Sequence, residues 1–452
     1  MSTAVARLGQ QLDLQIDGIG HDGQGVGRWQ ELVVFVPGAL PGERVTARVR
    51  RVAKRHLEAD LLTVERASPA RQRPACILAE RCGGCSLLHC TDSTQAELKT
   101  DLVRQALQRL GQLSVPVPPI WSAEAGLGYR NRALIPLERT ADGAVRAGYY
   151  RRGSHRIVNL NRCPVLDPRI DALIAPIKAD LEASGWPVDV NLSGGGGLRH
   201  LGLRVGHHSG EVLITLVSSH AQLPGLEQLA AAWCRRWPQV VGVGLNLQPK
   251  ANNVILGPET RCLSGRPWLL ERFAGVELRI AADTFFQVNT PQAERLVPPL
   301  AAFFAEATGP IVDAYCGIGT FSLPLAAAGA SVLGLEVHGA SVAQAQANAE
   351  RNALAQVRFE QADVAAVLAE RLTQASGLLV DPPRRGLSPE ALAAILSGLP
   401  ARLAYISCNP ATLARDLGQL CGAGAYRLLS LQPVDFFPQT SHVECLALLE
   451  RA

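Results

Sequence analysis

The sequence contains no hydrophobic run that approaches the roughly 20 residues needed to cross a bilayer, although 47% of its 452 residues are hydrophobic. It also lacks an apolar segment near its start, where residues 1–7 read Met-Ser-Thr-Ala-Val-Ala-Arg. A secretory signal peptide would place such a segment there. We therefore expect no membrane association and a cytoplasmic location. The chain is long enough for about three domains of ordinary size.

A strong net charge and a disulfide framework are missing as well. The formal net charge is +4, which by itself does not indicate a nucleic-acid partner. Lysine is scarce: only four of the 44 basic residues are lysines and 40 are arginines, so arginine richness alone carries little information. The 11 cysteines are odd in number and scattered, which argues against a set of disulfides.

Basic residues are nevertheless concentrated in two blocks. Residues 44–57 contain six basic residues and no acid, and apolar residues alternate with the arginines as in a half-buried strand with a basic outer face. Residues 129–169 contain nine arginines and three acidic residues. Both blocks suit contact with a phosphate backbone, and an ordinary solvated surface is the alternative. The first block holds Arg44, Arg48, Arg50, Arg51, Lys54 and Arg55.

A short apolar run, residues 403–406, leads into Ser407-Cys408-Asn409-Pro410 near the end of the chain. Ligands of open α/β sheets bind beyond the carboxyl ends of the strands, so a cysteine in this place is suited to act as a nucleophile. A single cysteine at a strand end is more often a small buried apolar residue. The preceding hundred residues decide between the two interpretations.

A nucleotide-type cofactor site is indicated upstream. A buried strand at residues 311–313 runs into a turn that contains Gly317 and Gly319, and an apolar helical stretch follows. Glycines at a strand-to-helix turn allow a ligand to approach the backbone closely. The third glycine of the dinucleotide fingerprint is absent, because Phe321 and Ser322 occupy that region. A cofactor without phosphates therefore fits better.

Acidic residues recur where the predicted strands end. Glu336 follows a second strand about one βα unit later, a position typical of a carboxylate that binds ribose hydroxyls. Asp363 and Asp381 follow two further strands. Each of them alone is explained equally well as a helix N-cap. Together with the glycine turn they predict an S-adenosylmethionine site at one edge of a doubly wound, Rossmann-like α/β sheet.

A possible metal centre is indicated by Cys76, Cys82 and Cys85, with two glycines between the last two, and by the distant Cys163. Three closely spaced thiolates and a remote one can ligate a metal. The spacing leaves open whether the metal is an iron–sulfur cluster or zinc. It also leaves open whether Cys163 or Cys90 supplies the fourth thiolate.

The chain divides into three parts by pattern. Residues 7–66 are rich in short strands separated by glycine turns, as in a small barrel. A central β-rich part follows to about residue 280, and a doubly wound α/β domain begins near residue 281. Residues 95–110 predict an amphipathic helix, which packs either within the central part or on the C-terminal domain.

Five motifs, in this order, resemble those of the RNA (uracil-5-)-methyltransferase family, and they cover the whole C-terminal domain. The chain is most similar to the branch of that family that modifies 23S ribosomal RNA and carries a TRAM domain and a [4Fe–4S] cluster. The motifs are Phe285-Phe286-Gln287-Val288-Asn289, Asp313-Ala314-Tyr315-Cys316-Gly317-Ile318-Gly319, Asp381-Pro382-Pro383-Arg384, Ser407-Cys408-Asn409-Pro410 and His442-Val443-Glu444.

The resemblance implies a domain organisation and a set of site residues. Residues 1–68 are expected to be a TRAM domain (an OB-like RNA-binding barrel), residues 69–280 a central iron–sulfur and RNA-binding domain, and residues 281–452 the methyltransferase domain. Cys408 is the implied nucleophile and Glu444 the implied base, although Glu444 alone resembles an exposed strand residue. The implied S-adenosylmethionine set is Gln287, Tyr315, Gly317, Thr320, Glu336, Asp363 and Asp381, and the implied cluster ligands are Cys76, Cys82, Cys85 and Cys163.

The chemistry of the family explains these residue types. C5 of uracil is too poor a nucleophile to attack a methyl sulfonium until a thiolate adds to C6, and a base must afterwards remove the C5 proton. The implied partner is 23S rRNA, with U1939 as the leading target and U747 or the tRNA T-loop uridine as alternatives. Two other classes stay open: a non-catalytic RNA-binding protein on this scaffold, and a methyltransferase of DNA cytosine or of an exocyclic amine.

Overall fold

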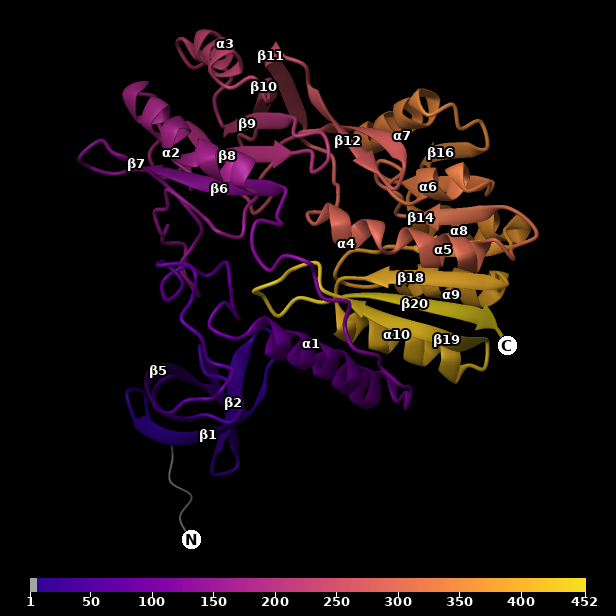
Figure 1. Cartoon of the computed structure of the whole chain (residues 1–452), viewed down its shortest axis with the longest axis horizontal. Helices are drawn as coiled ribbons and strands as arrows, with labels where there is room; N and C mark the ends of the chain where they lie inside the picture. Colours follow the sequence, from indigo (N-terminus) through magenta and orange to yellow (C-terminus); the bar gives the residue numbers. More distant parts are fainter. Residues whose placement is uncertain (1–5) are drawn as a thin grey trace.

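The computed structural model describes residues 6–452, and its first five strands close into a barrel in the order β1-β2-β3-β5-β4 (Figure 1). Along β4, Val45 and Val49 are buried whereas Arg48 and Arg50 are exposed. The predicted barrel and its half-buried basic strand are therefore confirmed. The strands are β1 (Gln11–Ile19), β2 (Gln24–Trp29), β3 (Leu32–Pro37), β4 (Arg44–Val52) and β5 (His56–Arg66).

The central part contains a six-stranded sheet in the order β11-β10-β9-β8-β6-β7. Strands β8 and β9 are buried at every residue, as expected for strands covered on both faces. Helices α2 and α3 share their apolar core with this sheet. The elements are β6 (Arg132–Arg139), β7 (Val145–Ala147), α2 (Pro168–Ala183), β8 (Leu198–Val205), β9 (Val212–Ser218), α3 (Leu226–Arg236), β10 (Val240–Leu247) and β11 (Glu259–Gly265).

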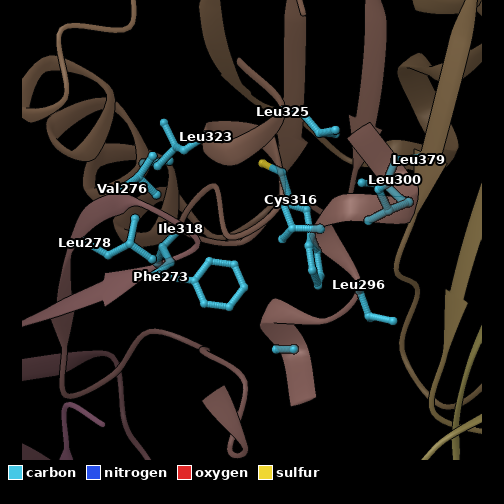
Figure 2. Close-up of a cluster of buried hydrophobic side chains, with 14 of the residues drawn as sticks. Phe273, Val276, Leu278, Leu296, Leu300, Cys316, Ile318, Leu323, Leu325 and Leu379 are labelled. Atoms are coloured by element: carbon cyan, nitrogen blue, oxygen red, sulfur yellow. The ribbon is translucent and has the colours of Figure 1, made fainter. Parts of the chain in front are cut away.

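A two-stranded ribbon, β12 (Trp268–Phe273) and β13 (Val276–Ala281), connects the central sheet to the C-terminal domain. Its buried residues share one apolar cluster with α4 (Thr290–Glu294), α5 (Val297–Phe304) and the glycine turn. Figure 2 shows Phe273 and Cys316 within this cluster. The predicted boundary near residue 280 thus falls at a strand that packs with the C-terminal core. Cys316 is a core residue and not a candidate nucleophile.

The C-terminal domain is built on a seven-stranded sheet in the order β16-β15-β14-β17-β18-β20-β19. The first five strands in this order are parallel, and β20 runs antiparallel to both of its neighbours. The predicted doubly wound α/β fold is confirmed. Its elements are β14 (Ile311–Ala314), α6 (Ser322–Ala327), β15 (Val332–Glu336), α7 (Gly339–Arg351), β16 (Val357–Gln361), α8 (Val364–Arg371), a 3-10 turn (Leu372–Gln374), β17 (Gly377–Val380), α9 (Pro389–Gly398), β18 (Arg402–Ser407), α10 (Pro410–Gly422), β19 (Tyr426–Val434) and β20 (Glu444–Arg451).

The helix predicted at residues 95–110 is α1 (Asp92–Ala106), which continues as a π-helical turn over Leu107–Gly111. It lies beside α10 (Figure 1), and its Val103 belongs to the apolar core of the C-terminal domain. The two segments approach closely at Gly418, where an added Cβ would lie 2.8 Å from the carbonyl oxygen of Gly111. The helix therefore packs on the C-terminal domain. In residues 6–452 no helix is both long and apolar enough to cross a membrane.

Candidate active site

The carboxyl ends of the parallel strands bring most of the predicted site residues to one edge of the sheet. The register between β18 and β20 pairs Ser407 with Cys445, so the next residues outward, Cys408 and Glu444, lie across from each other. Glu444 is only 6% exposed, and its alternative interpretation as an exposed strand residue is wrong. The residues at the other strand ends are Tyr315 after β14, Glu336 in β15, Asp363 after β16 and Asp381 after β17.

The glycine turn after β14 is shaped to face a ligand. Tyr315 and Gly317 have positive φ angles of 68° and 57°, and an added Cβ at Gly317 would meet no atom within 4 Å. The Gly317 amide donates a hydrogen bond of 3.1 Å to Oε2 of Glu336. The backbone is therefore open beside a carboxylate, as required for close approach of a ribose-bearing cofactor. Thr320 is buried at the end of this turn.

Asp363 has a structural explanation. Its carboxylate accepts a hydrogen bond of 3.0 Å from the Ala365 amide and so caps α8. Its charge also contributes to the raised pKa of Tyr315, after the larger effect of burial. Asp363 therefore lies beside the glycine turn, and its role at the cofactor stays a prediction.

Gln287 lies next to Asp381, because its Nε2 donates to Oδ2 of Asp381 over 3.4 Å. Asn131, just before β6, holds this segment in place: its Nδ2 donates to the Gln287 carbonyl at 2.9 Å and to Thr290 Oγ1 at 3.0 Å. No pattern in the sequence points to Asn131. It lies in the central part of the chain, far from every motif of the C-terminal domain.

Burial raises the pKa values of the carboxyl and thiol groups at the site and so favours their protonated forms. It raises the pKa of Asp381 to about 7, with a smaller contribution from Asp313, and it raises the pKa of Glu444 well above its ordinary value. It also raises the pKa of the Cys408 thiol to about 11, and the charges of Glu444 and Asp381 add to this shift. A carboxylate with a raised pKa is a stronger base when ionised, whereas the thiol needs nearby positive charge to ionise.

Arg384 supplies positive charge at the site, and its charge lowers the pKa of Cys408 and of Glu444. Its Nη2 lies 3.3 Å from Nε2 of His442. Its carbonyl accepts a hydrogen bond of 3.1 Å from Nδ2 of Asn409, the cap of α10. The motifs include Arg384 but imply no role for it. Its position directly after Asp-Pro-Pro at a strand end is the signal that could have marked it.

The four cysteines predicted as cluster ligands line one cavity of about 190 Å³. All four are free thiols, and the Gly84 amide points at the Cys82 sulfur over 3.4 Å. Burial, together with the neighbouring thiols, raises the pKa of Cys85 to about 12. Cys90 lies elsewhere, fully buried in a small apolar cluster with Leu40 and Leu87. The fold thus brings together the remote Cys163 and the three closely spaced cysteines.

The two basic blocks adjoin each other beside this cavity. Cys82 forms a β-bridge with Arg151, and an added Cβ at Gly153 would lie 3.8 Å from Nη1 of Arg50. Arg50 and Arg51 both bond the carboxylate of Glu58, at 2.8 and 3.0 Å. Basic residues far apart in the sequence therefore form a shared surface between the barrel and the central part.

Comparisons with known proteins agree with the motifs. Residues 273–452 match the tRNA (Uracil-5-)-methyltransferase family, and residues 6–62 match the TRAM domain. The chain is 54% identical over 449 residues, 98% of its length and 96% of the relative, to an uncharacterized RNA methyltransferase of Parasynechococcus marenigrum. It is 34% identical over 446 residues, 97% of its length and 96% of the relative, to an uncharacterized RNA methyltransferase of Bacillus cereus.

The chain belongs to the RNA (uracil-5-)-methyltransferase family. A solved structure is also similar: Pyrococcus abyssi tRNA (uracil-54, C5)-methyltransferase in complex with S-adenosyl-L-homocysteine. It is 28% identical, with a TM-score of 0.78, and the match covers 97% of this chain and 100% of that one. This RNA methyltransferase is therefore an S-adenosylmethionine-dependent enzyme with an N-terminal TRAM domain, as the motifs predicted.

Proposed function

We propose that this methyltransferase modifies C5 of one uridine in 23S rRNA, with U1939 as the leading target, through a covalent bond between Cys408 and C6 of the base. The observation that most strongly supports the covalent route is the register that sets Cys408 across from the buried Glu444; the 23S rRNA target is proposed from the resemblance of the motifs. When bound, S-adenosylmethionine supplies the methyl group as a sulfonium. A non-catalytic protein has no need of a buried carboxylate beside a thiol, since its burial is costly.

The proposed steps use the chain's own residues. The Cys408 thiolate adds to C6, and the electrons move into the ring, so that C5 becomes nucleophilic enough to take the methyl group from a sulfonium. The sulfur would keep the electrons of the broken S–C bond and leave as a neutral thioether. Glu444 then accepts the C5 proton, and the electrons of the broken C–H bond restore the C5–C6 double bond and expel the thiolate. Asp381, which lies beside Gln287, accepts a hydrogen bond from the N3–H of the uracil and so orients the ring.

The tRNA T-loop uridine is the second candidate target, and the similar structure of the tRNA (uracil-54) enzyme favours it. Mapping 5-methyluridine in the 23S rRNA and tRNA of a strain without this gene separates the candidates. Loss of the mark at U1939 alone would support the proposal. Loss at U747 or in the tRNA T-loop alone would replace it.

We also propose that Cys76, Cys82, Cys85 and Cys163 hold a [4Fe–4S] cluster. In residues 6–452, no three or more His, Cys, Asp or Glu side chains are grouped so as to hold a single metal ion. A structural zinc needs its four ligand atoms within about 2.3 Å of one point, whereas a four-iron cluster binds each thiolate through a separate iron. Four thiols that line one cavity suit such a cluster.

Protein purified without oxygen is therefore expected to be brown and to contain about four iron atoms and four sulfides per chain. Cys163→Ser should lose the colour and most of the iron, because it removes a thiol that lines the cavity. Cys90→Ser is the matched control and should keep both, since Cys90 lies outside the cavity. Colourless protein with stoichiometric zinc would contradict the cluster.

RNA binding is expected to depend on the basic strand β4. Replacement of Arg48, Arg50 and Arg51 by alanine should weaken affinity for a 23S rRNA transcript and make its salt dependence shallower, by about one unit of slope for each phosphate that is no longer neutralised. Affinity for S-adenosylmethionine should not change. Arg427→Ala is the control, because exposed Arg427 lies in β19, an edge strand of the C-terminal sheet and no part of the barrel. An unchanged salt slope in the triple variant would exclude β4 from the RNA interface.

A further inference from the structure

The connection between β19 and β20, residues 435–443, ends directly at Glu444. At its C-terminal end this connection therefore joins the catalytic sheet directly through Glu444, the residue proposed to remove the C5 proton. The segment carries no regular structure of its own. The position of the Glu444 carboxylate consequently depends on what holds this connection.

Helix α1 holds it through a reciprocal pair of hydrogen bonds. The Gln95 amide group donates from Nε2 to Oε1 of Gln439 over 2.9 Å, and the Gln439 backbone N–H donates to Oε1 of Gln95 over 2.9 Å. Gln439 Nε2 also donates to Oδ1 of Asp92 over 3.1 Å. Both glutamines are buried. Buried amides in such a pair fix one geometry, because any shift leaves polar groups unsatisfied.

The same helix contributes a buried ion pair one turn further along. Lys99 is fully buried, and its Nζ lies 2.6 Å from Oδ1 of Asp435 and 3.0 Å from the carbonyl of Phe437. Desolvation lowers the pKa of Lys99 and raises that of Asp435. Such a pair stabilises little overall but is costly to break. The ion pair fixes the start of the connection, at Asp435, to α1, and the hydrogen bonds of Gln95 fix its middle, at Gln439.

The other parts of the molecule converge on the same connection. Ser441 Oγ donates to the His21 carbonyl in the barrel over 2.8 Å, and the Ser441 amide donates to Ser86 Oγ over 3.0 Å. From the central part, the Tyr129 hydroxyl donates to the Pro438 carbonyl over 3.1 Å. The connection is thus the place where all three parts of the chain meet.

The backbone at Gln439 is strained. Its φ angle is +69°, in the left-handed region that is unfavourable for a residue with a Cβ. Such a conformation persists only where the surroundings fix it. The reciprocal bonds from Gln95 supply that constraint. The positive φ of Gln439, together with the hydrogen bonds from Gln95 and the ion pair of Lys99, indicates that residues 435–443 are held in one defined conformation.

We propose that Gln95 and Gln439, assisted by Lys99, are positioning residues that hold Glu444 against C5 of the bound uracil. This proposal rests on the proposed role of Glu444 as the base. It adds that a helix preceding the central sheet, outside the methyltransferase sequence motifs, completes the geometry for the proton-removal step. Thiol addition and methyl transfer do not use Glu444, so they should not depend on these residues.

The test separates the two halves of the reaction in Gln95→Ala and Gln439→Gly. Glycine at position 439 removes the side-chain bonds and also relieves the positive φ, so that variant keeps its fold most easily. Adduct formation on a transcript of 23S rRNA containing 5-fluorouridine reports addition and methyl transfer, because fluorine is not removed as a proton. Its rate should stay within about threefold of wild type. Release of methylated natural transcript should slow at least tenfold, with the methylated covalent complex accumulating.

The controls fix the interpretation. Glu97→Gln, on the exposed face of α1, should behave as wild type in both assays. The double variant Gln95→Ala/Gln439→Gly should release RNA no more slowly than the slower single variant, because both remove one shared interaction. Normal release in both single variants would overturn the positioning role. An equal loss of adduct formation, release and thermal stability would also overturn it and indicate a structural role only.

One further variant distinguishes failure of this proposal from failure of the proposed function. If Glu444→Gln itself releases methylated RNA at the normal rate, Glu444 is not the base and both proposals fail. If Glu444→Gln traps the complex but the Gln95 and Gln439 variants do not, only the positioning role fails.

Discussion

Cys408→Ala is expected to give neither methylated RNA nor a covalent complex. Without the thiolate, C5 of uracil stays too weak a nucleophile to take the methyl group, so the loss should exceed the factor of about 100 typical of removing a general base. The measurement is transfer of labelled methyl to a 23S rRNA transcript. A denaturing gel with 5-fluorouridine RNA should show no shifted band, whereas wild type should give one.

The matched control for Cys408 is Cys421→Ala. Cys421 is a partly buried free thiol on α10, in the same domain, and its removal should leave both assays unchanged. Cofactor binding should survive in Cys408→Ala, because Cys408 follows β18 whereas the glycine turn follows β14. Residual methylation by Cys408→Ala at more than a few percent of wild type would exclude the covalent route.

The edge of the C-terminal sheet at which the cofactor is expected to bind could be predicted, because local sequence determines where each strand ends. A parallel strand reads as a short apolar run, and the residue after it must lie at the carboxyl edge of the sheet. Glu336 and Asp381 could therefore be assigned to that edge from strand ends alone, and both lie there. Asp363 shows the limit of this reasoning, since the same position also makes an ordinary helix cap.

Contacts between distant parts of the chain were not predictable. Asn131 holds Gln287, and Gln95 holds Gln439, across long stretches of sequence, and no periodicity or motif marks such partners. Spacing likewise did not exclude Cys90 as the fourth ligand, and only the family resemblance implied Cys163. In the folded chain Cys163 lines the cavity with Cys85, whereas Cys90 does not.

Glu444→Gln is expected to stall the enzyme after methyl transfer. Glutamine keeps the size of the side chain but cannot accept the C5 proton, so the thiolate cannot be expelled. The variant should form a methylated covalent complex with natural RNA, visible as a shifted band that carries labelled methyl. Turnover should fall by more than about 100-fold. Normal turnover would mean that another group is the base, and Asp381→Asn would then be the next variant to examine.

The same variant should also be more stable than wild type, in a way that depends on pH. Burial raises the pKa of Glu444 well above its usual value of 4.5, so the folded state holds this proton more tightly than the unfolded state. That contribution to stability is full below about pH 4.5 and is lost as the pH rises toward the folded pKa. Thermal unfolding of the two proteins should therefore coincide near pH 5 and diverge by a few degrees at about pH 8 to 9, with Glu444→Gln the more stable. If the difference in unfolding temperature did not change with pH, the pKa of Glu444 would be the same in the folded and unfolded states. Its carboxylate would then not be the strengthened base that the proton-removal step requires.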